Sequence, residues 1–552
     1  MPLSRRLANA AFSIVMETLG RAAHRRLLRL ATDPAEAQSR ALLSILEACS
    51  GTDQGVAFNL HRDMDQSDYR RRVPIQSYED LRPGIERQIA TGALAVAPQR
   101  PLMYARTSGT TGKPKYIPVT PTAQTQAASA QRAMAFVQHK AARPFAGRIL
   151  GFGGSVREET LEDGTPAGAA SGLIYATMPR FMRVKYILPA SLFDLEDYDL
   201  KYRLAARLAA QAPDITLMAC ANPSTLLRMM QALNANLPTI AAEVSEGRCA
   251  ALENLPASMR EDVRERLAPD PPRGLALAAL ASGGRDVTLA DLWPNVRSVT
   301  TWLGGGCAHA AAVLREQLPA GAIMVDGGYV ASELRGTIVA DADSGLALPM
   351  LGDVFFEFAP VAEWESGVRD TLLLHEVEVG REYYVIISTI SGLLRYDMND
   401  VLRVTGRIAA TPTFAFMRKG RGVTSICGEK LAEDQVHAAI GTLPITARFF
   451  VVLADAPKAI YRAYIECAEE NLNADDAAAA LDEQLAQLNI EYAAKRDSGR
   501  LHPLALIRLR SGAGEAYHRH CVQKGQREAQ AKVLALQTVD EFDFDLTPFV
   551  VS

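Results

Sequence analysis

The chain shows two rhythms of apolar and polar positions, and each rhythm predicts one kind of element. Stretches rich in alanine and leucine, with apolar residues three or four positions apart, predict helices, and short β-branched or aromatic runs predict strands. Before Gly352 the two kinds follow one another, which is typical of an α/β fold with substantial parallel sheet. We expect two helices up to about Leu60, further helices from Ser77 toward Ala90, at 122–142, at 202–211 and from Pro223 to about Leu233, and strands at 149–152 and 215–219.

Between Gly352 and Thr405 the helical rhythm gives way to β-prone runs separated by short polar breaks. This pattern predicts an antiparallel sheet or small barrel attached to the main body. The charged, glycine-containing segment 418–422 then interrupts the pattern, and we interpret it as a hinge. The β-prone runs are 354–358, 371–374, 383–387 and 401–404, and the alanine- and acid-rich run 471–488 is expected to be a surface helix.

A length of 552 residues exceeds what one hydrophobic core usually holds, so the chain is expected to form at least two domains. We predict a large N-terminal domain over residues 1–417, the hinge at 418–422 and a smaller mobile α/β domain over 423–552.

Composition excludes several classes of protein. Hydrophobic residues make up 48% of the chain and the net charge is −4, which argues against nucleic acid or an anionic membrane as partner. The apolar stretch 7–15 is too short to span a bilayer, and no signal-peptide cleavage site follows it, so we expect a cytoplasmic protein without stable membrane insertion. The seven cysteines are scattered and form no Cys-x-x-Cys pair, which argues against structural zinc and disulfides.

The loop from Thr107 to Lys115 carries the strongest chemical signal, because it is crowded with glycines and hydroxyl groups and ends on lysine. Glycines let the backbone approach a ligand closely, and backbone N–H groups with threonine hydroxyls can surround phosphate oxygens. A Walker A loop is excluded, because only two residues separate Gly109 from Gly112 and proline follows Lys113. The loop resembles the phosphate loop of the adenylate-forming superfamily, which holds the pyrophosphate end of ATP; a polar surface turn is the structural alternative.

A second segment, Tyr329-Val-Ala-Ser-Glu333, follows a β-prone run and lies beyond the triple glycine at 304–306. Forming an acyl adenylate brings two anionic partners together, so a divalent cation must neutralise the developing charge. Mg²⁺ takes oxygen ligands and accepts one or two protein carboxylates. Glu333 is our candidate for that ligand and Tyr329 for stacking on adenine, while a solvated surface glutamate is the alternative.

The third segment runs from Gly392 to Val401. Asp400, placed between strands, can accept hydrogen bonds from both hydroxyls of a ribose. The alternative is a plain β-turn built by Asn399 and Asp400.

Taken together, these segments resemble the GH3 family of acyl-acid amido synthetases, which join plant hormones to amino acids and have bacterial relatives. The resemblance rests on Leu-Trp-Pro-Asn-Val at 292–296, the Tyr-x-x-Ser-Glu box and the stretch 392–406, and it runs from Tyr78 to Thr424. Lys115 lacks the following glycine that acyl-CoA ligases carry. The family has a firefly-luciferase-like fold, with a large N-terminal adenylation domain and a small mobile C-terminal domain.

The resemblance implies ATP and Mg²⁺ as cofactors and assigns roles to particular positions. It implies catalytic roles for Lys115, Glu333 and Lys532, with Glu333 also the metal ligand. The implied nucleotide-binding residues are Thr107, Ser108, Gly109, Thr110, Thr111, Gly112, Tyr329, Ser332, Asp400 and Arg418.

The chain departs from the family pattern at four places, one of which is the triple glycine at 304–306, which looks more like acyl-CoA ligases than like plant GH3 enzymes. Asn399 replaces a glycine, and the turn is expected to persist because asparagine tolerates a left-handed backbone. Asp397 replaces an arginine and reverses a charge near the nucleotide. Gln-Ala-Lys532 lacks the Pro-Arg that follows it in the family, which weakens the assignment of Lys532. His309 and His375 are candidates for the base that deprotonates the amine.

The predicted reaction has two steps. ATP and a small carboxylic acid form an acyl adenylate and pyrophosphate, and an amine, in the first instance an amino acid, then displaces AMP. An acyl-CoA ligase, which uses coenzyme A as acceptor, is one alternative, and an inactive nucleotide-binding scaffold is another.

Overall fold

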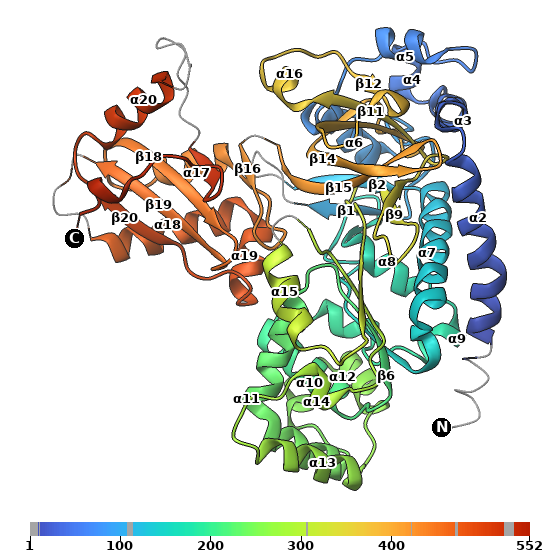
Figure 1. Ribbon diagram of the computed structural model, residues 1–552, viewed down its shortest axis with the longest axis vertical. Helices are drawn as coiled ribbons and strands as arrows, with labels where there is room; N and C mark the ends of the chain where they lie inside the picture. The colour runs from blue at the N-terminus through green and yellow to red at the C-terminus, as the bar shows by residue number, and fades with distance from the viewer. Residues whose placement is uncertain are drawn as a thin grey trace. The chain divides into compact units, whose positions relative to one another are not determined.

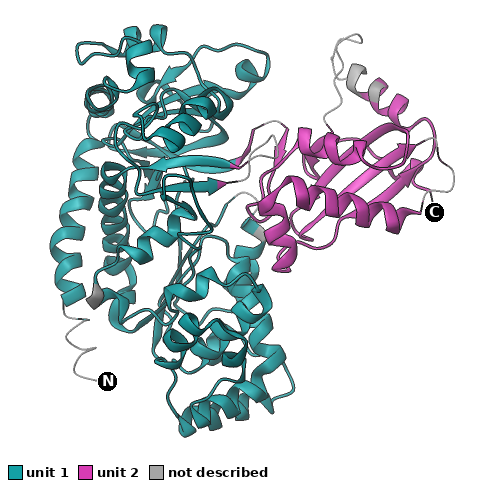
Figure 2. Ribbon diagram, turned by 180° about the vertical axis from the view of Figure 1, so that it is seen from behind, with its two compact units in different colours: residues 1–106, 115–417 teal, residues 107–114, 418–552 magenta. Residues whose placement is uncertain are grey.

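A computed structural model of the chain describes residues 9, 11–107, 114–304, 307–420, 422–467, 469, 473–523 and 535–551. The described structure forms two compact units, one made of residues 1–106 and 115–417 and the other of residues 107–114 and 418–552 (Figure 2). No helix among the described residues combines the length and apolarity needed to cross a bilayer. The cysteines whose side chains are described form no disulfide, namely Cys49, Cys220, Cys249, Cys307, Cys427 and Cys467.

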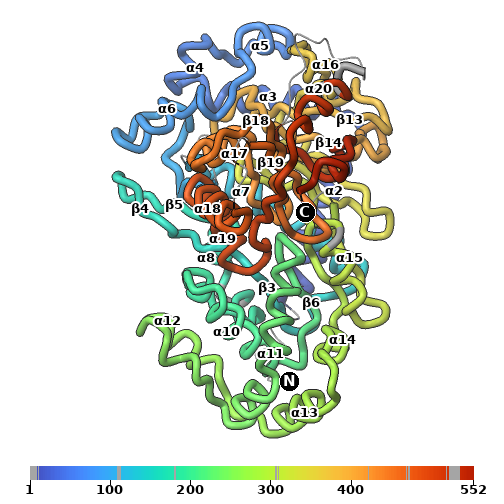
Figure 3. Tube along the Cα trace, turned by 90° about the vertical axis from the view of Figure 1, so that its left-hand side faces the viewer, coloured from blue at the N-terminus to red at the C-terminus, as the bar shows by residue number. Residues whose placement is uncertain are grey.

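The first unit contains a four-stranded parallel sheet in the order β3-β6-β7-β8, which confirms the α/β prediction. Helices α10 to α14 gather at one end of this unit (Figures 1 and 3), and their apolar faces pack with the strands into one core. Because the strands are parallel, their carboxyl ends lie at the same edge, where open α/β sheets bind ligands. The elements are β3 (Arg148–Gly151), β6 (Ile215–Ala219), β7 (Ser298–Thr301), β8 (Ile323–Asp326), α10 (Tyr198–Ala210), α11 (Ser224–Glu246), α12 (Ala257–Arg264), α13 (Pro271–Ala281), α14 (Leu289–Leu292) and α15 (Ala308–Glu316).

A second sheet, in the order β12-β11-β13-β14-β15, confirms the change of pattern after Gly352. Its first three pairings are antiparallel, and β11 is buried along its whole length because α3 covers one face and the main core the other. The run predicted at 371–374 is strand over two residues only and then turns. The bounds are β11 (Val354–Pro360), β12 (Leu372–Leu373), β13 (Glu382–Thr389), β14 (Tyr396–Ile408) and β15 (Thr411–Lys419), with α16 (Val361–Glu365) between β11 and β12.

A third sheet, in the order β2-β1-β5-β4, places the strands before and after the predicted phosphate loop next to each other. The helix predicted after Ser77 is confirmed, because Ser77 and Asp80 form a capping box at its start. Helix α7, capped by Thr120, lies beside α2 (Figure 1). These elements are β1 (Met103–Thr107), β2 (Lys115–Val119), β4 (Glu159–Thr160), β5 (Pro166–Gly168), α6 (Tyr78–Thr91), α7 (Pro121–Ala142), α8 (Ala170–Ala176) and α9 (Arg180–Arg183); a separate pair is β9 (Thr337–Val339) and β10 (Ala347–Pro349).

Two helix predictions were wrong in extent. The first stretch holds more than two helices, because Asp33 caps a new helix and Pro34 occupies its first position. The helix opened by Pro223 does not stop near Leu233 but continues through Pro238, because its apolar face stays buried as far as Val244. The N-terminal elements are a π-helical turn (Met16–Gly20), α2 (Arg21–Leu30), α3 (Pro34–Cys49), α4 (Asp53–Ala57) and α5 (Gln66–Arg72).

The second unit is a mixed sheet in the order β20-β19-β18-β21. Alternate residues of β18 pack into two different clusters, so both faces of the sheet are covered. The helix predicted within 471–488 is confirmed from Ala474, with one apolar face buried against the sheet. The elements are β16 (Val423–Thr424), β17 (Leu431–Ala432), α17 (Glu433–Gly441), β18 (Ala447–Asp455), β19 (Ile460–Cys467), α18 (Ala474–Leu488), α19 (Ile490–Asp497), β20 (Ala505–Leu509), α20 (Ala513–Gln523) and β21 (Leu536–Thr538).

Candidate nucleotide and metal site

Two of the predicted site residues meet in the first unit. The Tyr329 hydroxyl donates a hydrogen bond of 2.6 Å to Asp400 Oδ2, and both side chains are buried. Tyr329 lies on the loop between β8 and β9, and Asp400 lies in β14. The tertiary fold therefore joins the second and third sequence motifs directly.

The loop that carries Tyr329 is closed by contacts with β9. The Tyr329 backbone N–H donates to Thr337 Oγ1 at 2.8 Å, and its carbonyl accepts from the N–H of Gly336 at 2.8 Å. A Cβ on Gly336 would stand 2.4 Å from the Tyr329 ring, and Gly328 has φ +76 with the Thr337 carbonyl beside it. Both positions require glycine, because a side chain would force the loop away from β9.

The turn before Asp400 is held by its own side chains. Asn399 adopts φ +48, so the prediction that asparagine would keep a left-handed backbone here is confirmed. Asp397 Oδ1 accepts a hydrogen bond of 2.8 Å from the Asn399 N–H. The aspartate that reverses the family's charge thus helps to fix the turn.

The aromatic ring of Tyr329 lies against Phe416 of β15. Their ring centroids are 6.1 Å apart and the planes are nearly parallel, at 5°. Burial raises the pKa of the Tyr329 hydroxyl well above its usual value, and the negative charges of Asp400 and Glu333 raise it further. Tyr329 therefore remains a protonated hydrogen-bond donor to Asp400.

Glu333 carries the feature expected of a cation ligand. Its Oε2 is enclosed and has no hydrogen-bond partner in the described part of the chain. Burial is the main cause that raises the pKa of the Tyr396 hydroxyl, and the charge of Glu333 is the second cause that raises it. The described residues contain no cluster of three or more potential metal ligands, but Mg²⁺ needs only one or two protein carboxylates. The donor at Glu333 therefore fits that ion.

The structure describes the two residues at the ends of the predicted phosphate loop. Thr107 ends β1 and Lys115 begins β2, while residues 108–113, which include Ser108, Gly109, Thr110, Thr111 and Gly112, lie outside the described residues. Lys115 Nζ lies 5.4 Å from the centroid of the Tyr78 ring, and the Tyr78 hydroxyl accepts a hydrogen bond of 2.7 Å from the Tyr116 N–H. Helix α6 thus packs its first residue against the base of the loop.

The remaining predicted residues are not brought into this cluster. Ser332 is half-buried in the turn next to Glu333. Arg418 belongs to the second unit, where its Nε lies 3.4 Å from Glu541 Oε1. His375 is exposed, and Lys532 and the side chain of His309 lie outside the described residues.

Sequence analysis missed a buried ion pair that supports β14. Arg395 donates to both carboxylate oxygens of Glu357, at 2.9 and 2.8 Å, and to the carbonyls of Arg70 and Val73. Glu357 is the single acidic residue in the apolar run 354–358, which is the signal that would have pointed to a buried partner. The pair anchors the start of the strand that carries Asp400.

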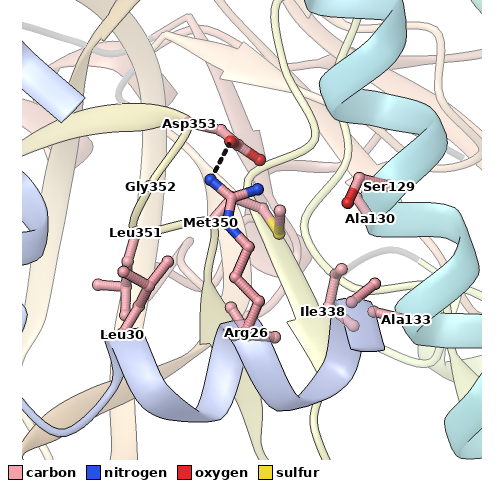
Figure 4. A pocket seen from close by; sticks show the side chains of 12 residues that line it. Arg26, Leu30, Ser129, Ala130, Ala133, Ile338, Met350, Leu351, Gly352 and Asp353 are labelled. Atoms are coloured by element: carbon pink, nitrogen blue, oxygen red, sulfur yellow. Dashed lines mark ion pairs between the residues drawn. The ribbon is translucent and has the colours of Figure 1, made fainter. Parts of the chain in front are cut away.

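A small cavity lies elsewhere in the same unit, between α2, α7 and the β9–β10 pair (Figure 4). Arg26 reaches across it toward Asp353, at 4.0 Å, and burial raises the pKa of that aspartate. None of the sequence-predicted residues lines this cavity, which is lined mainly by apolar and small side chains.

Comparison with protein families accounts for nearly the whole chain. Residues 23–320 match the GH3 family N-terminal domain, 347–419 the GH3 family central domain and 432–539 the GH3 family C-terminal domain. The chain belongs to the GH3 family.

Individual GH3 proteins resemble this chain with sequence identities of 28% and 24% in two examples. Indole-3-acetic acid-amido synthetase GH3.8 of Oryza sativa subsp. indica is 28% identical over 426 residues, which covers 73% of this chain and 69% of the relative. Indole-3-acetic acid-amido synthetase GH3.4 of Arabidopsis thaliana is 24% identical over 429 residues, with coverage of 74% and 71%.

A solved GH3 structure shares the fold. The AtGH3.15 acyl acid amido synthetase in complex with 2,4-DB matches with a TM-score of 0.67 and 20% identity, covering 97% of this chain and 96% of that one. The likeness in fold therefore extends over nearly the whole of both chains.

Proposed function

We propose that this GH3 protein is an ATP-dependent acyl-acid amido synthetase. It activates a small carboxylic acid as an acyl adenylate, with release of pyrophosphate, and then transfers the acyl group to an amine, for which we propose an amino acid. The observation that carries the proposal is the buried hydrogen bond between Tyr329 and Asp400, with the half-buried Glu333 near enough for its charge to act on Tyr329, within a chain that matches all three GH3 domains.

In the first step the chain's own residues bind and orient ATP. Asp400 offers carboxylate oxygens to the ribose hydroxyls, and Tyr329 fixes the orientation of that carboxylate. Lys115 is the first residue of β2 and ends the segment that resembles the phosphate loop, so we assign it to the phosphates. Preorganised charges of this kind are usually the largest contribution to such catalysis.

We assign Mg²⁺ to Glu333, whose enclosed Oε2 is a hard oxygen donor without another partner in the described structure. When bound, the ion supplies positive charge for the developing charge on the phosphates. Glu333 itself supplies a full negative charge at the tip of the turn Ala331–Leu334.

In the second step the amine attacks the acyl carbonyl and AMP leaves. We propose that residues 418–422 act as a hinge that gives the C-terminal domain different orientations in the two steps. The division into compact units changes between Met417 and Arg418, and Gly422 has φ +75, a backbone conformation that favours glycine.

Acid-dependent exchange of radiolabelled pyrophosphate into ATP tests the first step. We expect exchange with at least one member of a carboxylic acid library, and its absence across the library would reject the enzyme assignment. The active acid is then supplied with amino acids or with coenzyme A. Amide formation is expected, and a thioester as the only product would assign the chain to acyl-CoA ligase chemistry instead.

A further inference from the structure

An arginine that no motif singled out lies next to the proposed metal ligand. Residues Ala331 to Leu334 form a tight turn, with backbone hydrogen bonds in both directions between its ends. Val330 and Arg335 pair across the base of this turn. Glu333 lies in the turn and Arg335 lies at its base. Because only one residue separates them, their Cα atoms are about 7 Å apart or less.

The guanidinium of Arg335 is held at the carboxyl edge of the parallel sheet. One Nη donates a hydrogen bond of 3.1 Å to the carbonyl of Gly327, the residue that follows β8. Gly327 in turn lies against the indole of Trp302, the residue that follows β7. This is the edge at which open α/β sheets place their ligands.

Arg335 has no anionic partner among the described residues. Its Nε is enclosed without a hydrogen-bond partner. The residue as a whole is half-buried. A guanidinium that is partly withdrawn from water and lacks an anion is unfavourable, because desolvation of its charge is not compensated.

Two arginines that are fully buried in the described part of this unit are each compensated. Arg395 is paired with Glu357 through two hydrogen bonds, and Arg207 lies 3.7 Å from Glu243. The half-buried Arg335 has no ion pair of this kind among the described residues, so no acidic side chain there makes its charge purely structural.

We propose that Arg335 binds a second anionic group of the carboxylic acid, so that the substrate is a dicarboxylic acid or a comparable dianion. One carboxylate of such an acid reacts with ATP, and the other stays ionised against the guanidinium. This inference rests on the proposed function, because it names the class of acid that the adenylation site accepts.

The reacting carboxylate is the less suitable partner for this arginine. That carboxylate must act as the nucleophile, and it loses its negative charge when the acyl adenylate forms. A full positive charge placed on it would stabilise the ground state more than the transition state and would slow the reaction. A second anion keeps its charge through both steps, so its binding energy is retained throughout.

The test compares matched acids on wild type and Arg335→Met, which removes the charge but keeps the length of the side chain. Succinate, glutarate and adipate are paired with butyrate, valerate and hexanoate in the pyrophosphate-exchange assay. We expect wild type to prefer the dicarboxylates, and Arg335→Met to lose about ten- to a hundredfold in kcat/KM for them alone. Arg335→Lys should recover part of this loss because it restores the charge.

A second measurement does not depend on catalysis. The preferred dicarboxylate should raise the unfolding temperature of wild type and leave that of Arg335→Met unchanged. Arg315→Met, which removes an exposed arginine on α15, is the matched control and should behave as wild type. If this shift requires Arg335 although no acid supports exchange, the proposed function fails while the binding inference stands.

Two results would overturn the inference. An equal loss of kcat/KM for both acids of each pair would assign Arg335 to a group that both reactions share, the reacting carboxylate or the phosphates of ATP. Unchanged kinetics and an unchanged ligand-induced shift in Arg335→Met would leave the residue a structural hydrogen-bond donor to Gly327.

Discussion

The hydroxyl of Tyr329 is bonded to the carboxylate of Asp400 across 71 residues of sequence, at 2.6 Å. A neutral hydrogen-bond donor to a buried carboxylate fixes the direction of that carboxylate. The bond also joins the β8–β9 loop to β14, so a change at either end is expected to reach the other.

Replacing Tyr329 with phenylalanine keeps the ring against Phe416 and removes the donor to Asp400. We expect the KM for ATP to rise about ten- to a hundredfold, because a hydrogen bond to a charged group contributes about 1.5–3 kcal/mol. Exchange assays at varied ATP measure this effect. An unchanged KM in a folded protein would show that the direction of Asp400 does not matter for ATP binding.

Replacing Glu333 with glutamine removes the proposed metal-binding charge with almost no change in shape. Exchange activity should be lost at ordinary Mg²⁺ concentrations and return in part when Mg²⁺ is raised. Glu363→Gln, at an exposed position of α16, is the control and should retain full activity. Full activity of Glu333→Gln at ordinary Mg²⁺ would disprove the assignment.

The fully buried Arg395 and the half-buried Arg335 should respond differently to the same substitution. Arg395→Met removes the bidentate partner of the buried Glu357 and leaves Arg70, 3.3 Å from its Oε1, as the remaining cation, and we expect a loss of about 3 kcal/mol in the free energy of unfolding. Arg335→Met removes a charge that has no partner in the described structure, so the free energy of unfolding should stay equal or rise. Denaturant unfolding without ligand measures both, and a similar large loss in the two variants would contradict the distinction between them.

The hinge prediction concerns Gly422, whose φ of +75 is outside the range that proline can adopt. Gly422→Pro should slow amide formation far more than adenylate formation, because the two steps use different orientations of the C-terminal domain. Single-turnover assays that follow adenylate and amide separately test this. Equal slowing of both steps in a folded variant would argue against rotation at this segment.

Gly422→Ala serves as the milder control for the same position. Alanine is strained at positive φ but keeps the backbone N–H that proline lacks. We expect the same kind of imbalance between the two steps as in Gly422→Pro, but a smaller one.

The sequence was sufficient wherever local chemistry decides the outcome. The helix expected after Ser77 begins there, where Ser77 and Asp80 form a capping box, and Asn399 adopts the left-handed backbone expected of it. The strand at Ile215–Ala219 has the predicted bounds, since a short apolar run buried in a parallel sheet has a clear signature. The motifs around Tyr329, Glu333 and Asp400 were also visible as residue types at particular spacings.

Helix bounds were less accurate where long-range packing outweighs a local signal. Pro238 would end a helix on local grounds, yet α11 continues through it because residues on both sides are buried in the same core. No window around Pro238 contains that information, since the packing partners come from distant parts of the chain.

The sequence by itself therefore determined the two kinds of sheet, the caps and turns, and the residue types that point to adenylation chemistry. Only the tertiary structure decided which of these residues meet. It joined Tyr329 to Asp400, paired Arg395 with Glu357 and left Arg335 without an anion among the described residues. The physical reason is that burial and pairing of charge depend on segments brought together from far apart, whereas propensity and turn chemistry act within a few residues.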